Sequence, residues 1–205
     1  MRAPLRHHAC TKFPQEILAT VTAELQKGQR LTLSRDTDVI SIPFGKTVTL
    51  ESGAEVEVMQ ARGTSISLAH AGRLYLLEGD QRDAVGLPAI PRPTLPADAD
   101  DAALEAFVWE QLRTCYDPEI PVDIVELGLV YGCRINTLLT GERMVNIRMT
   151  LTAPGCGMGD VIAADARHKI LGAPQLSKVH VEIVFDPPWS REMMSEEARL
   201  ELGMF

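Results

Sequence analysis

Cysteine is scarce in this chain, and a long apolar run is missing altogether. The four cysteines, Cys10, Cys115, Cys133 and Cys156, lie far apart and form no CxxC pair. This spacing argues against a disulfide framework and favours free thiols in a reducing compartment. No apolar stretch approaches the roughly 20 residues that a membrane-spanning helix needs, and residues 1–26 contain no apolar core of a signal peptide. We therefore expect a cytoplasmic protein with no membrane partner.

A basic stripe is also missing, because the second half of the chain is acidic. Residues 1–97 carry a net charge of +1 and residues 98–205 a net charge of −9. Proteins that bind nucleic acids neutralise phosphates with clustered lysine and arginine, so no nucleic-acid partner is predicted. Nucleotide motifs are missing as well. The glycines at 155, 157 and 159 imitate a dinucleotide fingerprint, but Asp160 stands where GxGxxG needs its last glycine.

Glycine and proline divide the chain into four predicted parts. Residues 1–30 form an N-terminal extension. Residues 31–87 form a small all-β module, because short apolar segments recur there between glycines. Residues 88–97 contain four prolines and predict a semi-rigid linker, and residues 98–205 form a second domain. The strands expected in the β module are 31–33, 39–42, 47–50, 56–59, 65–68 and 74–77.

The second domain is predicted to be α+β, with the order α-β-β-α-β-α. Helical or alternating spacing of apolar residues defines each element. Asp117-Pro118 should end the first helix, because a residue before proline avoids the helical region. This order favours a small mixed sheet with helices packed on one face. The helices are expected over 98–115, 157–171 and 190–202, and the strands over 129–135, 144–151 and 178–185.

The strongest chemical signal is the segment TLTAPGCGMGD at 150–160, which carries a single cysteine among glycines. It follows an alternating strand and precedes a helical segment, so Cys156 is expected in the first turn of a helix. Unpaired backbone amides there carry partial positive charge and stabilise a thiolate, the form that attacks electrophiles and binds soft metals. Gly155 and Gly157 would leave the sulfur uncovered. A small buried thiol in a glycine turn is the plainer alternative.

A second signal is the acidic turn DPEIPVD at 117–123. An Asp-Pro pair commonly ends a helix, because aspartate bonds the backbone two residues on and proline fixes the turn. A functional role for Asp117 or Glu119 requires that they lie near Cys156, where a carboxylate could orient a group, accept a proton or bind a hard metal. The sequence leaves both interpretations open.

A cysteine-dependent hydrolase is the main enzyme alternative. His168 follows Cys156 by 12 residues, about 18 Å along a helix, which is too far for a general base. His180 is expected on the outer face of a strand and could approach. A zinc site with Cys115 or Cys133 is a weaker alternative, because these spacings match no zinc-ligand pattern.

Three ordered motifs in the second domain resemble one known family. DPEIPVDIVELGLVY, MTLTAPGCGMGD and VEIVFDPPWSREMMSEEARLELGM together resemble the SufT family of the SUF iron–sulfur cluster assembly system, over residues 98–205. The segment IPFGKTVTLESGAEVEVMQARGTSISL resembles the N-terminal region of that family more loosely. Related domains occur in the PaaD proteins of phenylacetate degradation and in Mrp-type cluster-carrier ATPases.

The resemblance implies a compact α+β fold and a non-enzymatic maturation factor that helps to deliver Fe–S clusters to apo-proteins. The implied partners are SUF or other Fe–S assembly proteins and client apo-proteins. A cysteine-dependent enzyme, or a PaaD-like accessory component of an oxygenase system, is the alternative.

The resemblance also assigns the site residues. Cys156 corresponds to the family's reactive cysteine, Asp117-Pro118-Glu119 to its acidic turn, and Thr150 and Thr152 to its TLT segment. Gly155 and Gly157 flank the thiol. No tightly bound cofactor is implied. Clusters generally take four cysteine ligands, so Cys156 would be one ligand of a transient cluster, and a partner protein, a second protomer or a small thiol would supply the rest.

Overall fold

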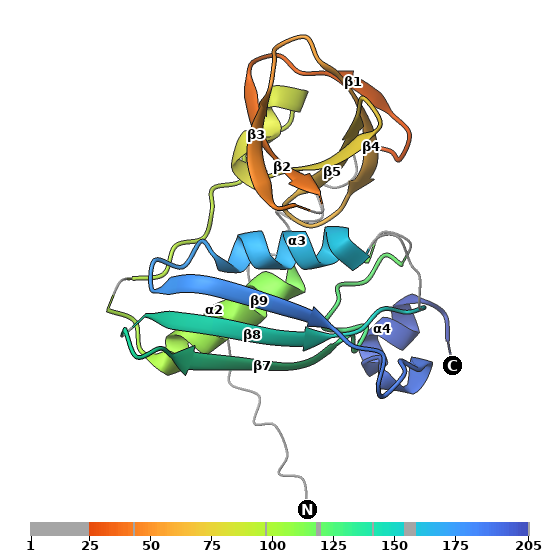
Figure 1. The fold of residues 1–205 in the computed structure, drawn as a ribbon. Coiled ribbons are helices and arrows are strands. Elements are labelled where there is room, and N and C mark those ends of the chain that lie inside the picture. The colour runs from red at the N-terminus through yellow and green to blue at the C-terminus, as the bar shows by residue number, and fades with distance from the viewer. Residues whose placement is uncertain are drawn as a thin grey trace, which may run out of the picture.

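The computed structural model describes residues 25–42, 44–96, 98–117, 120–140, 142–153 and 159–204. Six antiparallel strands form one sheet in the first half of the chain, in the order β1-β4-β5-β6-β2-β3. The sheet rolls up into a small barrel-like shape (Figure 1), and we refer to β1–β6 as the barrel. Its strands are β1 (Arg30–Thr32), β2 (Thr37–Ile42), β3 (Lys46–Leu50), β4 (Glu55–Ala61), β5 (Ile66–His70) and β6 (Arg73–Leu77).

The six strands predicted in the β module are confirmed. Successive side chains of a strand point to opposite faces of the sheet, so every second residue faces the inside of the barrel. The inward-facing residues include Val39, Val58, Leu68 and Leu77, which are fully buried in one core. The sequence did not predict the 3-10 helix η1 (Gly79–Val85), which follows the last strand and places Ala84 in the same core.

The second half contains a three-stranded sheet in the order β7-β8-β9. β7 runs antiparallel to β8, and β8 runs parallel to β9, which confirms the predicted α+β fold with a mixed sheet. The parallel pair needs a crossover, which α3 supplies. The elements are α2 (Asp101–Arg113), β7 (Val130–Thr137), β8 (Arg143–Met149), α3 (Gly159–Ile170), β9 (Leu176–Ile183), the 3-10 helix η2 (Arg191–Met193) and α4 (Glu196–Glu201).

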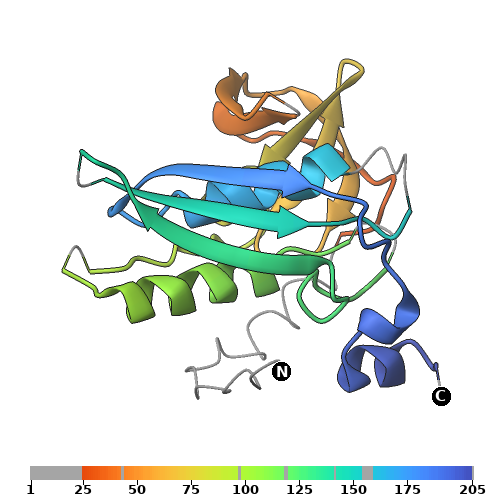
Figure 2. The same ribbon diagram turned by 60° about the horizontal axis from the view of Figure 1, so that its bottom comes forward.

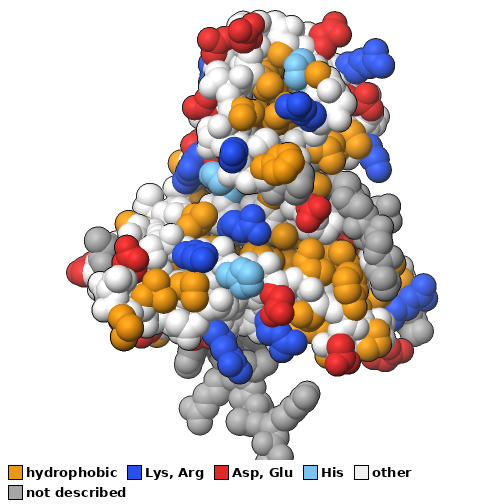
Figure 3. Space-filling view, in the orientation of Figure 1, with side chains coloured by type: hydrophobic (Ala, Val, Ile, Leu, Met, Phe, Trp, Pro, Cys, Tyr) orange, Lys and Arg blue, Asp and Glu red, His pale blue; other side chains and the backbone are white. Residues whose placement is uncertain are grey.

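Helices α2 and α3 cover the same face of this sheet (Figures 1 and 2). Val145, Ile147 and Met149 of β8 join both helices in one buried cluster. The residues between these on β8 point to the opposite face of the sheet. That face carries a mixture of charged, histidine and hydrophobic side chains (Figure 3). Arg148 and Glu182 form an exposed ion pair there, with 3.6 Å between nitrogen and oxygen.

Two boundaries in the C-terminal part differ from the sequence prediction. β9 ends at Ile183, not at 185: the Val184 amide makes a last hydrogen bond to the Met149 carbonyl at the end of β8, and the chain then leaves the sheet. Phe185, which the predicted strand included, therefore lies beyond the end of β9 and is exposed. The helix predicted over 190–202 is split, because Met194 is extended and the Ser195 side chain accepts a hydrogen bond from Ala198 and starts α4.

The barrel sits on α3 (Figure 1). Ile40, Ile42 and Leu76 of the barrel form a small buried cluster with Val161 and Ala164 of α3. The division of the chain at 88–97 stays a prediction. Within the described residues, no helix has both the length and the apolar character needed to cross a membrane.

Candidate functional site

The candidate site lies at the carboxyl end of β8. Three backbone hydrogen bonds bring the segment 115–129 to that end. The Ile124 amide donates to the Cys115 carbonyl, Leu129 to Ile124, and Thr150 to Leu129. The segment after α2, which contains the acidic turn, therefore borders the residues that follow β8. The structure thus brings Asp117 and the TLT segment to one end of the sheet, although 33 positions separate Asp117 from Thr150.

The two ends of the loop that carries Cys156 are in contact. β8 ends at Met149 and α3 begins at Gly159. A Cβ atom on Gly159 would lie 2.7 Å from Leu151 Cδ1, so the start of α3 packs closely against Leu151 and a larger residue would displace that side chain. Pro154–Met158 lie outside the described residues, and so the predicted roles of Gly155, Cys156 and Gly157 stay predictions.

Asp117 is buried, with 3% of its surface exposed. Its Oδ1 accepts a hydrogen bond from the Ile120 amide at 3.1 Å, which is the local turn expected of an aspartate before proline. Its backbone carbonyl accepts a second bond, from Gln60 of the barrel, at 3.1 Å. Pro118 and Glu119 lie outside the described residues, so the position of Glu119 relative to the loop stays a prediction.

Thr150 and Thr152 follow β8 directly, and they differ in burial. Thr150 is fully buried, whereas Thr152 is half-buried. The Thr150 hydroxyl has no hydrogen-bond partner among the residues that the structure describes. Within the described residues the Thr150 hydroxyl therefore leaves a donor and an acceptor unused directly after β8, and a buried polar group without a partner costs about 1–3 kcal/mol.

Asp123 is a titratable residue of this site to which the sequence argument gave no role. Burial raises its pKa from 3.8 to about 6, even though its Oδ1 accepts hydrogen bonds from the amides of Val125 and Glu126, at 2.9 and 3.0 Å. It also faces Tyr116 in an isolated β-bridge. The sequence shows Asp123 as the last residue of DPEIPVD, but not its burial.

The two cysteines that the structure describes, Cys115 and Cys133, both have thiols of raised pKa. Cys115 is fully buried, and burial raises the pKa of its thiol well above the ordinary value, with the nearby Asp165 adding to the effect. Burial, together with the charge of Glu105, raises the pKa of Cys133 to about 11. At neutral pH both therefore stay protonated, and the thiolate is the form that reacts.

The described histidines do not lie at the start of α3. His168 is near the opposite end of that helix and pairs with Glu78 of the segment after β6. His180 is exposed on β9, as predicted for the outer face, and His70 bonds the Glu55 carbonyl within the barrel. In the described part of the chain, no three His, Cys, Asp or Glu side chains are grouped so that they could hold a metal ion.

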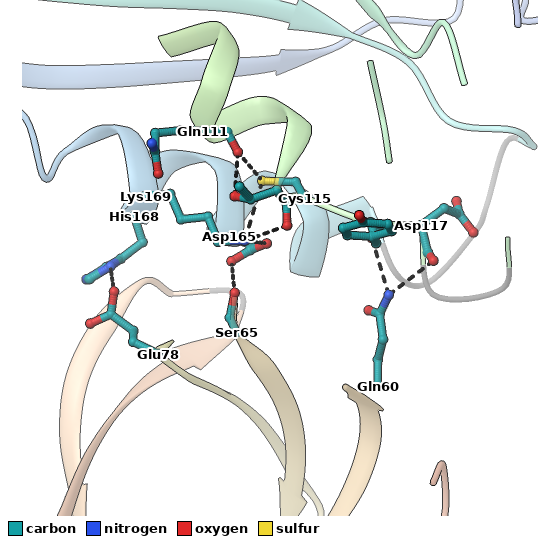
Figure 4. A network of polar contacts seen from close by, with 11 residues as sticks. Gln60, Ser65, Glu78, Gln111, Cys115, Asp117, Asp165, His168 and Lys169 are labelled. Atoms are coloured by element: carbon teal, nitrogen blue, oxygen red, sulfur yellow. Dashed lines mark hydrogen bonds and ion pairs between the residues drawn. The ribbon is translucent and has the colours of Figure 1, made fainter. Parts of the chain in front are cut away.

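A buried polar network joins α3 to the barrel and to the end of α2 (Figure 4). The Ser65 hydroxyl donates to Asp165 Oδ1 at 2.6 Å. The Lys169 ammonium donates to Asp165 Oδ2 at 2.8 Å and to the Thr114 carbonyl at 2.9 Å. Burial alone would lower the pKa of Lys169, but the Asp165 carboxylate raises it on balance. Sequence reasoning missed this network, because Ser65 and Asp165 are 100 residues apart.

Fold and described residues together define the class of this protein: a small α+β domain in which Leu151 contacts Gly159 across the segment that carries Cys156, joined to a β-barrel. The chain belongs to the family of iron–sulfur cluster assembly proteins, whose family model matches residues 105–183. This match, together with a SufT relative of Staphylococcus aureus, confirms the resemblance to the SufT family.

Curated bacterial relatives share this family. The Fe-S protein maturation auxiliary factor of Porphyromonas gingivalis is 43% identical over 99 residues, which are 48% of this chain and 90% of that protein. The maturation auxiliary factor YitW of Bacillus subtilis is 35% identical and covers 51% of this chain and 98% of its own length. The maturation auxiliary factor SufT of Staphylococcus aureus is 39% identical, over 43% of this chain and 96% of its own length.

Proposed function

We propose that this protein is a non-enzymatic maturation factor that assists delivery of Fe–S clusters to apo-proteins. The relatives are named maturation auxiliary factors, and the family model that matches residues 105–183 describes iron–sulfur cluster assembly. Its partners are then Fe–S assembly proteins of the SUF type and client apo-proteins. The acidic second half suits basic partner surfaces.

In this proposal Cys156 is the reactive thiol. The observation that supports it is the series of backbone hydrogen bonds that joins Cys115, Ile124 and Leu129 to Thr150, together with the contact between Leu151 and Gly159 on either side of residues 154–158. Cys115 and Cys133, by contrast, have raised pKa values. Cys156 accepts or orients sulfur or iron of the cluster during hand-over, and the acidic turn with Glu119 shapes the pocket.

One thiolate supplies one ligand, so the cluster is cargo held jointly with another molecule. A partner protein, a second protomer or a small thiol provides the remaining ligands. Such an incomplete site favours transfer over storage, because the cluster leaves when the partner dissociates. The Thr150 hydroxyl, which has no partner among the described residues, supports the same interpretation, since a hydrogen bond to a sulfur atom tunes cluster stability.

The test replaces the gene in its host by the Cys156→Ser version and measures the activity of a 4Fe–4S dehydratase under iron limitation. Cys133→Ser is the matched control, because it changes the same atom in a thiol of raised pKa. We expect Cys156→Ser to match the deletion strain and Cys133→Ser to match the wild type. Wild-type activity with Cys156→Ser would reject the reactive thiol. A deletion strain with normal dehydratase activity would reject the maturation function itself.

A further inference from the structure

The barrel has an open edge at β3. β1 and β3 are the two outer strands of the six-stranded sheet, and β3 pairs with β2 along one side only. Figure 1 shows β3 at the side of the barrel. Among the described residues, no backbone group outside β2 bonds to the backbone of residues 46–50. A row of free amide and carbonyl groups of this kind is a template on which a further strand can pair.

β3 lacks the features that protect the other outer strands. Outer strands are commonly very short, charged or interrupted by a bulge. β1 has only three residues, the register of β7 is interrupted between Val130 and Gly132, and β9 carries Lys178 and Glu182. β3 has five residues, KTVTL, and an uninterrupted register with β2. Its only charge is at its first residue, and its three central residues have high strand propensity.

The surface beside this edge includes uncovered apolar side chains. Val48 lies opposite Val39 in the strand register, so both side chains point to the inner face of the sheet. Val39 is fully buried there, whereas 37% of the surface of Val48 is exposed. Phe44, in the turn before β3, is 77% exposed. A strand added beside β3 would therefore cover Val48 and use the free backbone groups at the same time.

The sequence of β3 is complementary to itself. When two copies pair antiparallel with a two-fold axis at Val48, the two Val48 side chains meet, and Thr47 of each copy faces Thr49 of the other. Cross-strand Thr–Thr pairs stabilise neighbouring strands, and the valine contact removes apolar surface from water. The charges agree as well, because Lys46 at the start of each strand lies beside Glu51, which follows the end of the other strand.

We infer that β3 is a dimerisation edge, at which two copies of this chain join their barrels through antiparallel β3 strands with the two-fold axis at Val48. Such an interface is closed, so association stops at two copies, whereas pairing of β3 with β1 of another copy would continue into a filament. The barrel lies outside residues 105–183, which the family model matches. The inference goes beyond the proposed function and does not depend on it.

Sedimentation equilibrium of the purified full-length protein measures the dissociation constant of the dimer. The disrupting variant is Val48→Lys, which places two like charges directly opposite each other. The matched control is Leu139→Lys, because Leu139 is also an exposed apolar residue but lies in the turn between β7 and β8. We expect the wild type and Leu139→Lys to dimerise alike, and Val48→Lys to raise the dissociation constant about tenfold or more.

A pair of double variants tests the register itself. Thr47→Lys/Thr49→Lys places lysine opposite lysine across the interface, whereas Thr47→Glu/Thr49→Lys places glutamate opposite lysine. The two proteins differ only at position 47, and both lose the hydrogen bond from Thr49 to Asp38. Each cross-strand pair occurs twice, so we expect the dissociation constant of the first variant to exceed that of the second about tenfold at low salt. High salt should reduce this difference, because it screens exposed charges.

Four results would overturn the inference. A wild type that stays monomeric up to about 1 mM would exclude the dimer, and a dimer that Val48→Lys leaves intact would place the interface elsewhere. Equal dissociation constants for the two double variants would reject the register. A wild type that dimerises only after residues 1–24 are removed would make those residues, and not a second copy, the occupant of the edge.

Discussion

At the scale of single residues, the chemistry of this site depends on which groups are buried. Asp117, Thr150 and Asp123 all come from ordinary polar positions of the sequence, and burial makes them unusual. Asp117 is enclosed with its hydrogen bonds made, Thr150 is enclosed with its hydroxyl unused among the described residues, and Asp123 is enclosed with a raised pKa. Asp123 gives the clearest test of this burial.

Replacing Asp123 by asparagine should change how stability depends on pH. Because burial raises the folded pKa from 3.8 to about 6, the folded state binds more protons than the unfolded state between these values. The free energy of unfolding of the wild type therefore falls as pH rises from about 4 to about 6. Asp123→Asn should remove this fall and be more stable at neutral pH, by at most about 3 kcal/mol.

Urea denaturation at a series of pH values measures this effect. The asparagine oxygen can still accept from the amides of Val125 and Glu126, so the two local hydrogen bonds are kept. Asp98→Asn, at an exposed position, controls for the change in net charge. A variant with the same slope as the wild type between pH 4 and pH 6 would show that Asp123 ionises normally in the folded protein.

At the scale of elements, hydrogen bonds join the C-terminal segment to the bend that leads into β7. The Trp189 indole donates to the Leu127 carbonyl at 2.8 Å, and the Ser195 amide donates to the Glu126 carbonyl at 2.9 Å. Gly128 has a positive φ of 69°, and a Cβ atom there would lie 2.1 Å from the Met193 carbonyl oxygen. The bend positions Leu129, whose carbonyl accepts a hydrogen bond from the Thr150 amide. These contacts of the C-terminal segment therefore support the residues that follow β8.

Gly128→Ala should therefore be strongly destabilising. The left-handed conformation costs an ordinary residue about 1–2 kcal/mol, and displacing the Met193 carbonyl should cost roughly 2 kcal/mol more. Gly203→Ala is the matched control, since Gly203 has nearly the same φ, 68°, and nothing within 4 Å of the added carbon. The difference between the two losses in the free energy of unfolding measures the cost of displacing Met193. Equal losses would mean that the C-terminal segment moves away from the added carbon at no cost.

Regular elements could be predicted from the sequence because their signal is local. The six barrel strands, the β7–β8 hairpin and α3 each repeat apolar residues at the period of the element. The C-terminal helix was predicted as one piece, because the acidic segment after Pro188 has helical composition throughout. Nothing in the sequence marks Ser195 as the residue that caps a separate helix. The Cys156 loop and the acidic turn were identified as a candidate site, but Asp123 was not, because its burial depends on tertiary packing.

The contacts between the halves could not be predicted. Gln60, Gly63 and Ser65 belong to an ordinary β-hairpin sequence, and nothing in their neighbours indicates that they face Asp117, Thr114 and Asp165. Such contacts depend on how the barrel docks, which local periodicity does not encode. The β-bulge between Val58 and Gln60 is likewise visible only in the strand register.

At the scale of the whole molecule, one buried ion pair joins three elements. Lys169 and Asp165 of α3 are paired at 2.8 Å, with 9% and 12% of their side chains exposed. Lys169 also bonds the residue that caps α2, and Asp165 bonds Ser65 of the barrel. Removing one charge leaves the other buried and unpaired, which is far more costly than breaking a surface pair.

Lys169→Met should lower the free energy of unfolding by about 3–5 kcal/mol. Arg148→Met is the control, because it breaks the exposed pair with Glu182 and should cost less than about 1 kcal/mol. The double variant Lys169→Met/Asp165→Leu should recover part of the loss, since it also removes the stranded carboxylate. Urea denaturation of the wild type, Lys169→Met, Asp165→Leu and the double variant gives the coupling between the two charges. If the double variant loses as much as the two single losses added together, Lys169 and Asp165 act independently, and the junction between barrel and α3 depends on its apolar cluster and the hydrogen bond from Ser65.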